Sequence, residues 1–205
     1  VAPEVSIVEA TDGQYRIVSE GLVGSGDGGH PELPGTLLRF ALPPDADFGS
    51  VSINVLSEDL KPVRGEYDLV PSPYAAAEVD GQFIIDAVSD QIVDGKDMAV
   101  YGSDEYYDLE TCTLLSTQQM GRWKLAEVYY SPFAYLPSSG EVLVAENLSF
   151  TLNYKGGDPL PQDLAGLTTW DASISEMVAN YDQAATWYTS AEAAVEEATN
   201  DTGDY

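Results

Sequence analysis

Hydrophobic and polar residues alternate strictly in two stretches of this chain. In the stretch 50–57 Val51, Ile53 and Val55 alternate with Ser52 and Asn54, and within 147–154 the apolar side chains stand at even positions with polar residues between them. A period of two places all the apolar side chains of a strand on one face. Both stretches are therefore predicted to be β-strands with one buried and one solvent-exposed face.

Shorter strand-like segments with turn signals between them extend this pattern. Residues 4–10 and 14–20 flank Thr11-Asp12-Gly13, which predicts a hairpin. The apolar run 37–42 is predicted to be a strand that ends at Pro43-Pro44, because proline cannot donate to a ladder. Further strands are predicted over 63–70, 99–101, 111–116, 123–130 and 141–145. About ten such segments predict a mainly β protein, an antiparallel β-sandwich or jelly-roll-like fold.

The period changes in the last quarter of the chain. Apolar residues recur there at steps of three and four, at Ile174, Met177, Val178, Tyr181, Ala185 and Tyr188. This spacing predicts one amphipathic helix over about 172–188, with Asp171 or Ser173 as its cap. We therefore divide the chain into a β-sandwich domain, 1–157, and a segment 158–205 that holds a linker, the helix and an acidic tail.

The charge of the chain excludes several classes of partner. Eight basic residues face 35 acidic ones, for a net charge of −27. Nucleic acid is excluded as a partner because its binding needs a positive protein surface. An anionic membrane would repel the acidic surface of this chain for the same reason. No apolar run approaches eighteen residues, so we expect no membrane insertion. The acidity is spread along the chain, which suits either a salty environment or solubility in general.

Catalytic chemistry has few possible carriers. Cys112 and His30 are the one cysteine and the one histidine, so a Cys/His dyad is formally possible. Cys112 lies in a predicted strand, where a buried and inert thiol is the expected state. We expect no catalytic residue in this chain, and the single cysteine excludes an internal disulfide.

Carboxylates at Asp86, Asp90, Asp94 and Asp97 are candidates for a calcium site, since calcium prefers oxygen ligands near a glycine. The alternative is chance clustering, because carboxylates are abundant throughout the chain. Their spacing does not match an EF-hand. We expect no obligatory cofactor and keep calcium as the one possible ion.

The rare cations gather in two places, Lys61 and Arg64, and Arg122 and Lys124. One interpretation is that they pair with neighbouring carboxylates and relieve repulsion. The other is that one of them projects from a loop into the acidic pocket of a partner. The polar segment 116–121 ends in glycine and predicts such a loop just before Arg122.

Several motifs follow one another in an order that resembles the propeptides of gingipain-like (family C25) cysteine peptidases. They are Gly29-His30-Pro31-Glu32-Leu33-Pro34, Pro43-Pro44-Asp45-Ala46, Tyr101-Gly102-Ser103-Asp104, Gly121-Arg122-Trp123-Lys124, Pro132-Phe133-Ala134-Tyr135-Leu136-Pro137 and the closing strands within 141–154. Together they cover most of residues 28–156.

The resemblance implies a non-catalytic N-terminal prodomain of a secreted cysteine peptidase. Such a prodomain is a β-sandwich that covers the active-site cleft, keeps the zymogen latent and assists folding. Its partner is the peptidase's own catalytic domain, and its location is extracellular or periplasmic. A start at Val1 agrees with removal of a signal peptide, although trimming would look the same.

In the best-known members of this family a basic side chain of the prodomain occupies the specificity pocket of the peptidase. The resemblance makes Arg122 the first candidate for this role, and Lys61 or Arg64 the second. The competing interpretation, from a different class of protein, is a secreted or cell-surface β-sandwich binding module with no attached protease, stabilised by calcium.

Overall fold

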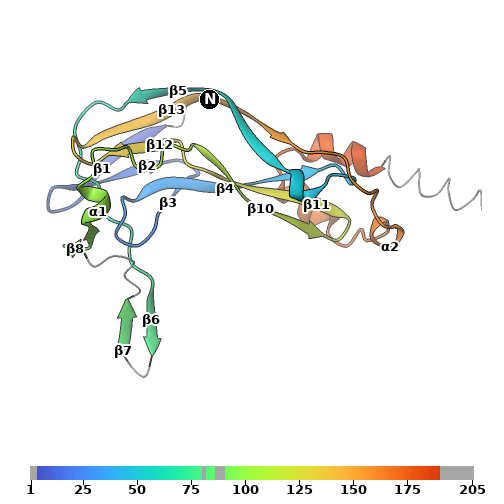
Figure 1. Ribbon diagram of the computed structural model, residues 1–205, viewed down its shortest axis with the longest axis horizontal. Coiled ribbons are helices and arrows are strands. Elements are labelled where there is room, and N and C mark those ends of the chain that lie inside the picture. Colours follow the sequence, from blue (N-terminus) through green and yellow to red (C-terminus); the bar gives the residue numbers. More distant parts are fainter. Residues whose placement is uncertain (1–3, 80–81, 86–90, 190–205) are drawn as a thin grey trace, which may run out of the picture. The chain divides into compact units, whose positions relative to one another are not determined.

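The computed structural model describes residues 4–79, 82–85 and 91–189 (Figure 1). Its strands are β1 (Val5–Thr11), β2 (Gln14–Ser19), β3 (Val23–Ser25), β4 (Leu33–Leu42), β5 (Ser52–Pro62), β6 (Ala76–Val79), β7 (Gln82–Ile85), β8 (Ile92–Val93), β9 (Lys96–Asp97), β10 (Cys112–Met120), β11 (Trp123–Tyr130), β12 (Phe133–Leu136) and β13 (Glu141–Asn153). Its helices are a short 3-10 turn (Phe48–Ser50), α1 (Met98–Tyr101), α2 (Gln162–Ala165), α3 (Asp171–Met177) and a helix over 181–189. The predicted tail after 189 lies outside the described residues.

Two compact units share the chain in alternation. Unit 1 comprises Val1–Thr36, Val55–Cys112 and Tyr130–Ser149, and unit 2 comprises Leu37–Asn54, Thr113–Tyr129 and Phe150–Tyr205. The strand orders are β1-β2, β10-β11-β4-β3, β12-β13-β5, β6-β7 and β8-β9. The predicted mainly β, sandwich-like fold is confirmed, while the predicted division at residue 157 stays a prediction. Within the described ranges, no helix is long and apolar enough to cross a membrane.

Unit 1 contains the N-terminal hairpin that the sequence predicts. β1 and β2 pair antiparallel from Val5 opposite Ser19 to Thr11 opposite Gln14. Asp12 and Gly13 form the turn with positive φ angles of 47° and 81°, which the short polar side chain and the glycine tolerate. The unit's core consists of Ile17, Leu33, Leu69, Phe133, Tyr135, Val142 and Val144.

The strand that ends before Pro43-Pro44 is longer than predicted. β4 begins at Leu33 instead of residue 37, and Pro34 lies inside it, opposite Gly24 of β3. β3 has three residues and stands at the edge of its sheet. The φ of proline is compatible with an extended chain, so Pro34 can lie within the strand, although it has no N–H to donate to a neighbouring strand.

Four other local predictions are wrong. β5 runs from Ser52 to Pro62, beyond the predicted end at residue 57, because β13 pairs alongside it. β10 continues to Met120 where we predicted a loop. The segment 63–70 is no strand and keeps one isolated bridge, between Leu69 and Tyr15. The predicted edge strand 99–101 is α1, whose first turn is capped by Asp97 through a 2.9 Å bond from the Ala99 N–H.

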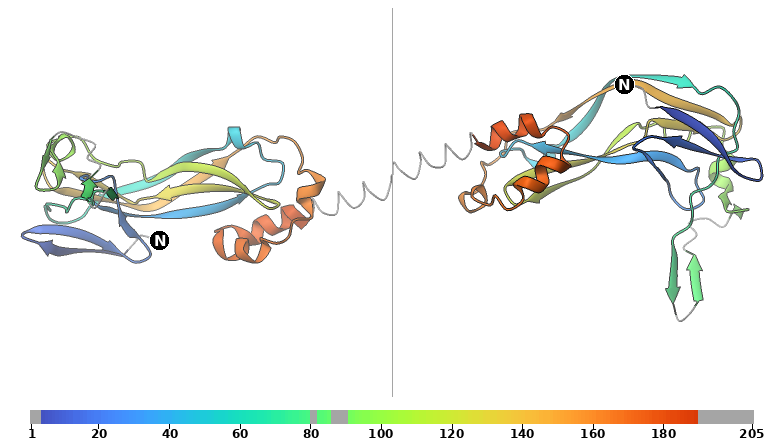
Figure 2. Two further views of the ribbon diagram at one scale, coloured as in Figure 1. Left: turned by 90° about the horizontal axis from the view of Figure 1, so that it is seen from below. Right: turned by 180° about the vertical axis from the view of Figure 1, so that it is seen from behind.

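The predicted C-terminal helix is interrupted. α3 ends at Met177, Val178 is extended (φ −101°, ψ 137°), and helix resumes over 181–189 (Figure 2). The interruption occurs because Val178 forms a parallel bridge with Arg39 of β4, and the Ala179 N–H donates to the Arg39 carbonyl at 2.9 Å. The break also shifts the buried face, so that Ala184 is buried and Ala185 half-buried.

Around this segment unit 2 builds its own core. Trp123 is 1% exposed and lies 4.1 Å from the ring of Tyr188 and 5.8 Å from that of Tyr181, measured between ring centroids. Ile174 and Val178 are buried against the same cluster. The apolar stripe of the predicted helix is therefore core, as its period indicated, although two helical pieces carry it.

Candidate functional site

The first predicted site residue, Arg122, lies at the tip of the hairpin formed by β10 and β11. Its side chain is buried, with the whole residue 9% exposed. Its Nη2 lies 2.6 Å from Oδ2 of Asp171 and its Nε lies 3.1 Å from Oδ1, while the Trp123 Nε1 donates to the same Oδ1 at 2.7 Å. The cation is thus held by the first residue of α3, as the charge-pairing interpretation expects.

Gly121 explains why this tip sits so close to the segment before α3. Its φ is +58°, and a Cβ at this position would lie 2.9 Å from Cδ1 of Trp170 and 3.1 Å from the Leu167 carbonyl oxygen. Any side chain here would push the hairpin away from the chain that leads into α3. Glycine at 121 therefore allows the approach that brings Arg122 to Asp171.

The second candidate, Lys61, is exposed near the end of β5 but is also paired. Its Nζ donates to Oε2 of Glu146 on β13. This hydrogen bond, together with the charge of the same carboxylate, raises the pKa of the Lys61 amine. Lys61 therefore forms an ion pair with Glu146 at the surface.

Arg64 is in a different environment. It is exposed, lies in the irregular loop after β5, and belongs to none of the ion pairs among the described residues. Its backbone is held from within the loop, where the Tyr67 hydroxyl donates to the Arg64 carbonyl at 2.6 Å. Gly65 follows with a φ of +125°, and a Cβ there would lie 2.4 Å from the Tyr67 hydroxyl oxygen. The loop thus presents a charged side chain on a defined turn.

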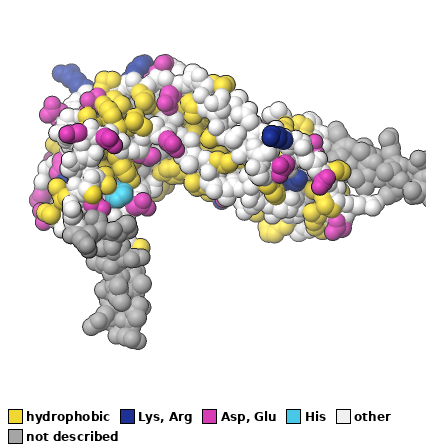
Figure 3. Space-filling model, in the orientation of Figure 1, with side chains coloured by type: hydrophobic (Ala, Val, Ile, Leu, Met, Phe, Trp, Pro, Cys, Tyr) yellow, Lys and Arg dark blue, Asp and Glu magenta, His cyan; other side chains and the backbone are white. Residues whose placement is uncertain are grey.

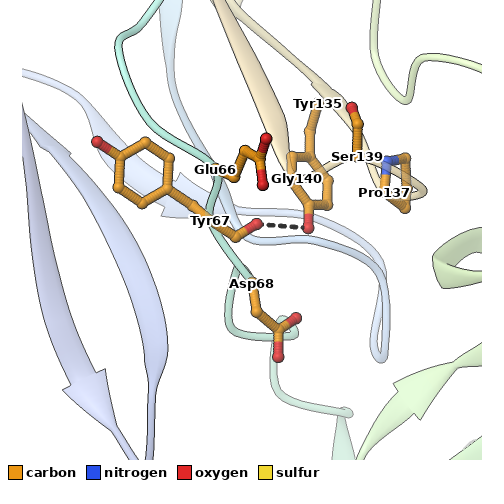
Figure 4. Close-up of a pocket in the computed structure, with 7 residues that line it drawn as sticks. All are labelled: Glu66, Tyr67, Asp68, Tyr135, Pro137, Ser139 and Gly140. Atoms are coloured by element: carbon orange, nitrogen blue, oxygen red, sulfur yellow. Dashed lines mark hydrogen bonds between the residues drawn. The ribbon is translucent and has the colours of Figure 1, made fainter.

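An open pocket of about 310 Å³ is lined in part by the residues that directly follow Gly65 in the sequence (Figure 4). Its lining residues are Glu66, Tyr67, Asp68, Tyr135, Pro137, Ser139 and Gly140. The Tyr135 hydroxyl donates to the Tyr67 carbonyl at 2.9 Å, which ties the loop to β12. Lys96 donates to both oxygens of Asp68, at 2.5 and 2.6 Å. Of the two acidic side chains in the pocket, Glu66 is exposed to solvent and Asp68 is neutralised.

The calcium candidates divide into two pairs. Asp86 and Asp90 lie outside the described residues. Asp94 stands in the turn between β8 and β9 with a φ of +50°, and Asp97 uses Oδ1 to cap α1. In the parts of the chain that the structure describes, no three acidic, histidine or cysteine residues are grouped so as to hold a metal ion. Calcium binding therefore stays a prediction.

Cys112 and His30 have separate surroundings. Cys112 is 5% exposed, and burial together with the nearby Glu58 carboxylate raises the pKa of its thiol to about 11. His30 Nε2 lies 3.8 Å from Oδ2 of Asp97, and its ring meets that of Tyr107 edge-on at 5.5 Å. A thiol with such a raised pKa is mostly protonated at neutral pH, which disfavours its use as a nucleophile.

Sequence reasoning missed the partner of Arg122 and the pocket after Arg64. Asp171 appeared there only as a candidate helix cap, and it stands 49 residues from Arg122. In the sequence, Tyr67 lies in a predicted strand and Tyr135 in one of the ordered motifs, and neither position indicates a pocket. A signal was present in Arg64-Gly65, although it lies within the predicted strand 63–70, since a polar residue beside glycine favours an exposed turn.

The fold has counterparts among solved structures. One is a chain in the complex of the pro- and mature domains of RgpB from Porphyromonas gingivalis, which matches over 88% of this chain and 87% of that chain with a TM-score of 0.63 and 14% identity. Another comes from a structure addressing the zymogenic latency of gingipain K from the same organism, over 76% of this chain and 82% of that one, with a TM-score of 0.56 and 18% identity. No protein-family model and no curated protein matches the sequence. The predicted resemblance to gingipain propeptides is confirmed as a likeness of fold.

Proposed function

We propose that this chain is the non-catalytic prodomain of a secreted, gingipain-like cysteine peptidase. It keeps the zymogen latent by covering the active-site cleft of its own catalytic domain, and it assists the folding of that domain. The observation that supports this most is the match over nearly the whole of both chains with a chain from a complex of pro- and mature domains. The ordered motifs between residues 28 and 156 support it independently of the fold.

The surface charge supports a basic partner. With a net charge of −27, the chain attracts a positively charged surface and repels an acidic one. On the face drawn in Figure 3, dark blue cationic side chains are few among the magenta carboxylates. A catalytic domain of opposite sign would associate quickly and be held strongly at low salt.

Among the three candidate cations, exposure favours Arg64 for entry into a specificity pocket. Arg122 would first have to leave Asp171 and its packing on Trp123, and Lys61 would have to leave Glu146. Arg64 has neither obstacle, and its loop is tethered by Tyr67. We therefore place Arg64 ahead of Arg122 and Lys61 as the inhibitory side chain.

Inhibition in trans tests the proposal. The isolated chain, added at micromolar excess to the mature domain of its own peptidase, should slow peptide hydrolysis. Arg64→Ala should weaken this inhibition by about 30-fold or more, because the acidic pocket would lose its charged partner. Lys155→Ala, at another exposed lysine, is the matched control and should inhibit as the parent chain does.

Two outcomes would count against these assignments. Full peptidase activity at micromolar excess of the chain would contradict the prodomain function and favour the binding-module alternative. Inhibition that Arg64→Ala leaves intact but Arg122→Ala abolishes, with both variants folded by circular dichroism, would move the inhibitory role to Arg122.

A further inference from the structure

The pocket of about 310 Å³ in unit 1 has two walls that are bonded to each other. One wall is the segment 66–68, and the other is the end of β12 with the turn that follows it. The Tyr67 N–H donates to the Gly140 carbonyl at 2.8 Å, and the Tyr135 hydroxyl donates to the Tyr67 carbonyl at 2.9 Å. Gly140 has a φ of +72°, and a Cβ there would lie 2.8 Å from the Tyr67 nitrogen. Glycine at 140 therefore allows the walls to come this close.

The charge of this pocket is negative by one carboxylate. Its lining includes Glu66 and Asp68 and no lysine, arginine or histidine. Lys96 donates to both oxygens of Asp68 and compensates its charge. Glu66 forms no ion pair and no side-chain hydrogen bond with any residue that the structure describes. A concave site with one uncompensated negative charge attracts a ligand with a single positive charge.

The position of Glu66 suits a ligand that enters the pocket. In Figure 4 its carboxylate points toward Tyr135 and the 137–140 turn, whereas the Tyr67 ring points away from them. Ser139 on the same turn is exposed, and its hydroxyl is a second polar group that can accept a hydrogen bond. Donors are therefore wanted from the ligand, and the pocket offers them oxygen atoms.

The other lining surface favours a long side chain over a small ion. Pro137 is half-buried and presents its apolar ring beside these oxygens. The methylene stem of an arginine or lysine packs on apolar surface while its charged end stays with polar groups. A guanidinium can give two parallel N–H donors to one carboxylate, which the ammonium of lysine cannot match. Glu66 beside Pro137 therefore favours arginine.

We propose that this pocket binds an arginine side chain of the catalytic domain. The identity of the partner rests on the proposed function, in which a chain of net charge −27 associates with a basic surface. The pocket begins two residues after Arg64, so one short segment gives a cation to the partner and receives one from it. Two ion pairs of opposite direction fix the register of the two domains, because a displaced arrangement leaves like charges facing each other.

Binding of a small probe tests the pocket itself. N-acetyl-arginine N-methylamide, added at millimolar concentration to the ¹⁵N-labelled chain, should shift the amide signals of Glu66, Ser139 and Gly140 more than those of unit 2. The citrulline analogue has nearly the same shape without the charge and should bind about ten-fold more weakly. Glu66→Gln should weaken binding of the arginine probe by the same factor. Glu176→Gln, which removes an exposed carboxylate from unit 2, is the control for net charge.

Inhibition in trans tests the partner. Glu66→Gln should inhibit the mature domain of the chain's own peptidase about ten-fold more weakly than the parent chain, with the larger difference at low salt. Glu176→Gln should inhibit as the parent chain does, and circular dichroism checks that both variants are folded. No inhibition by the parent chain would contradict the proposed function and with it the partner. Normal inhibition by both the parent chain and Glu66→Gln would contradict this inference alone.

Two results with the probes would also overturn the inference. Equal binding of the arginine and citrulline analogues would show that the charge of the side chain is not recognised. Binding of N-acetyl-lysine N-methylamide at least as strong as that of the arginine probe would contradict the two-donor contact with Glu66.

Discussion

Asp171 organises the C-terminal half of unit 2 through a single carboxylate. It accepts hydrogen bonds from the Arg122 guanidinium and from the Trp123 indole, both of which are buried. A buried cation is tolerated only when a partner compensates its lost hydration. Asp171 therefore decides whether the hairpin tip and α3 stay together.

Asp171→Ala should destabilise the chain by about 3 kcal/mol, because it leaves a buried guanidinium and an indole N–H without their acceptor. Urea unfolding followed by tryptophan fluorescence measures the change. Asp163→Ala removes an exposed carboxylate from α2 and should shift stability by less than about 0.5 kcal/mol. Similar midpoints for the two variants would show that the Arg122 contact contributes little.

At the scale of elements, the segment 178–180 acts as an additional short strand beside β4. Val178 bridges Arg39, and Asn180 continues the pairing with its side chain in place of its backbone. The Asn180 Nδ2 donates to the Ala41 carbonyl at 2.9 Å, and the Ala41 N–H donates to Oδ1 at 2.8 Å. The amide thus completes the hydrogen bonds of a residue that is 2% exposed.

Asn180→Ala should cost about 2–3 kcal/mol, since it leaves one buried N–H and one buried carbonyl unsatisfied. The protection of the Ala41 amide in hydrogen exchange should fall by a factor that corresponds to this loss. Asn153→Ala, at an exposed asparagine at the end of β13, is the control and should behave like the parent chain. Unchanged exchange at Ala41 would refute the role of Asn180.

At the scale of the whole molecule, repulsion between carboxylates opposes folding. There are 35 acidic side chains, and five of the eight basic residues already form ion pairs with them in the described structure. The remaining charge is uncompensated and spread over the chain. Compaction brings these charges together, which costs free energy that dissolved salt reduces by screening.

The melting temperature should therefore rise by about 5 °C between 0.05 and 1 M NaCl, as calorimetry would measure. Replacing three exposed carboxylates, in a variant with Glu9→Gln, Asp158→Asn and Glu176→Gln, should raise the melting temperature at low salt and flatten this dependence. A melting temperature that is independent of salt, or equal slopes for both proteins, would argue against repulsion as a major term.

Local pattern was sufficient for much of the fold. The hairpin at Asp12-Gly13, the strands around 53 and 150 and the apolar stripe ending at Tyr188 follow from periods and turn residues that neighbours in sequence define. The ordered motifs added the likeness to gingipain propeptides. For the site, the sequence identified the cations and the resemblance placed Arg122 first, but neither could show which of them form ion pairs.

The tertiary structure decided what depends on residues far apart in the chain. The helix breaks at Val178 because Arg39 offers a strand partner, and Arg122 is buried because Asp171 reaches it. Arg64 is presented on a tethered loop because Tyr67 folds back onto it. By itself the sequence determined the elements, since propensity and period are local. Only the folded chain determined which cations are paired, because hydrogen bonds and ion pairs join residues that no local pattern connects.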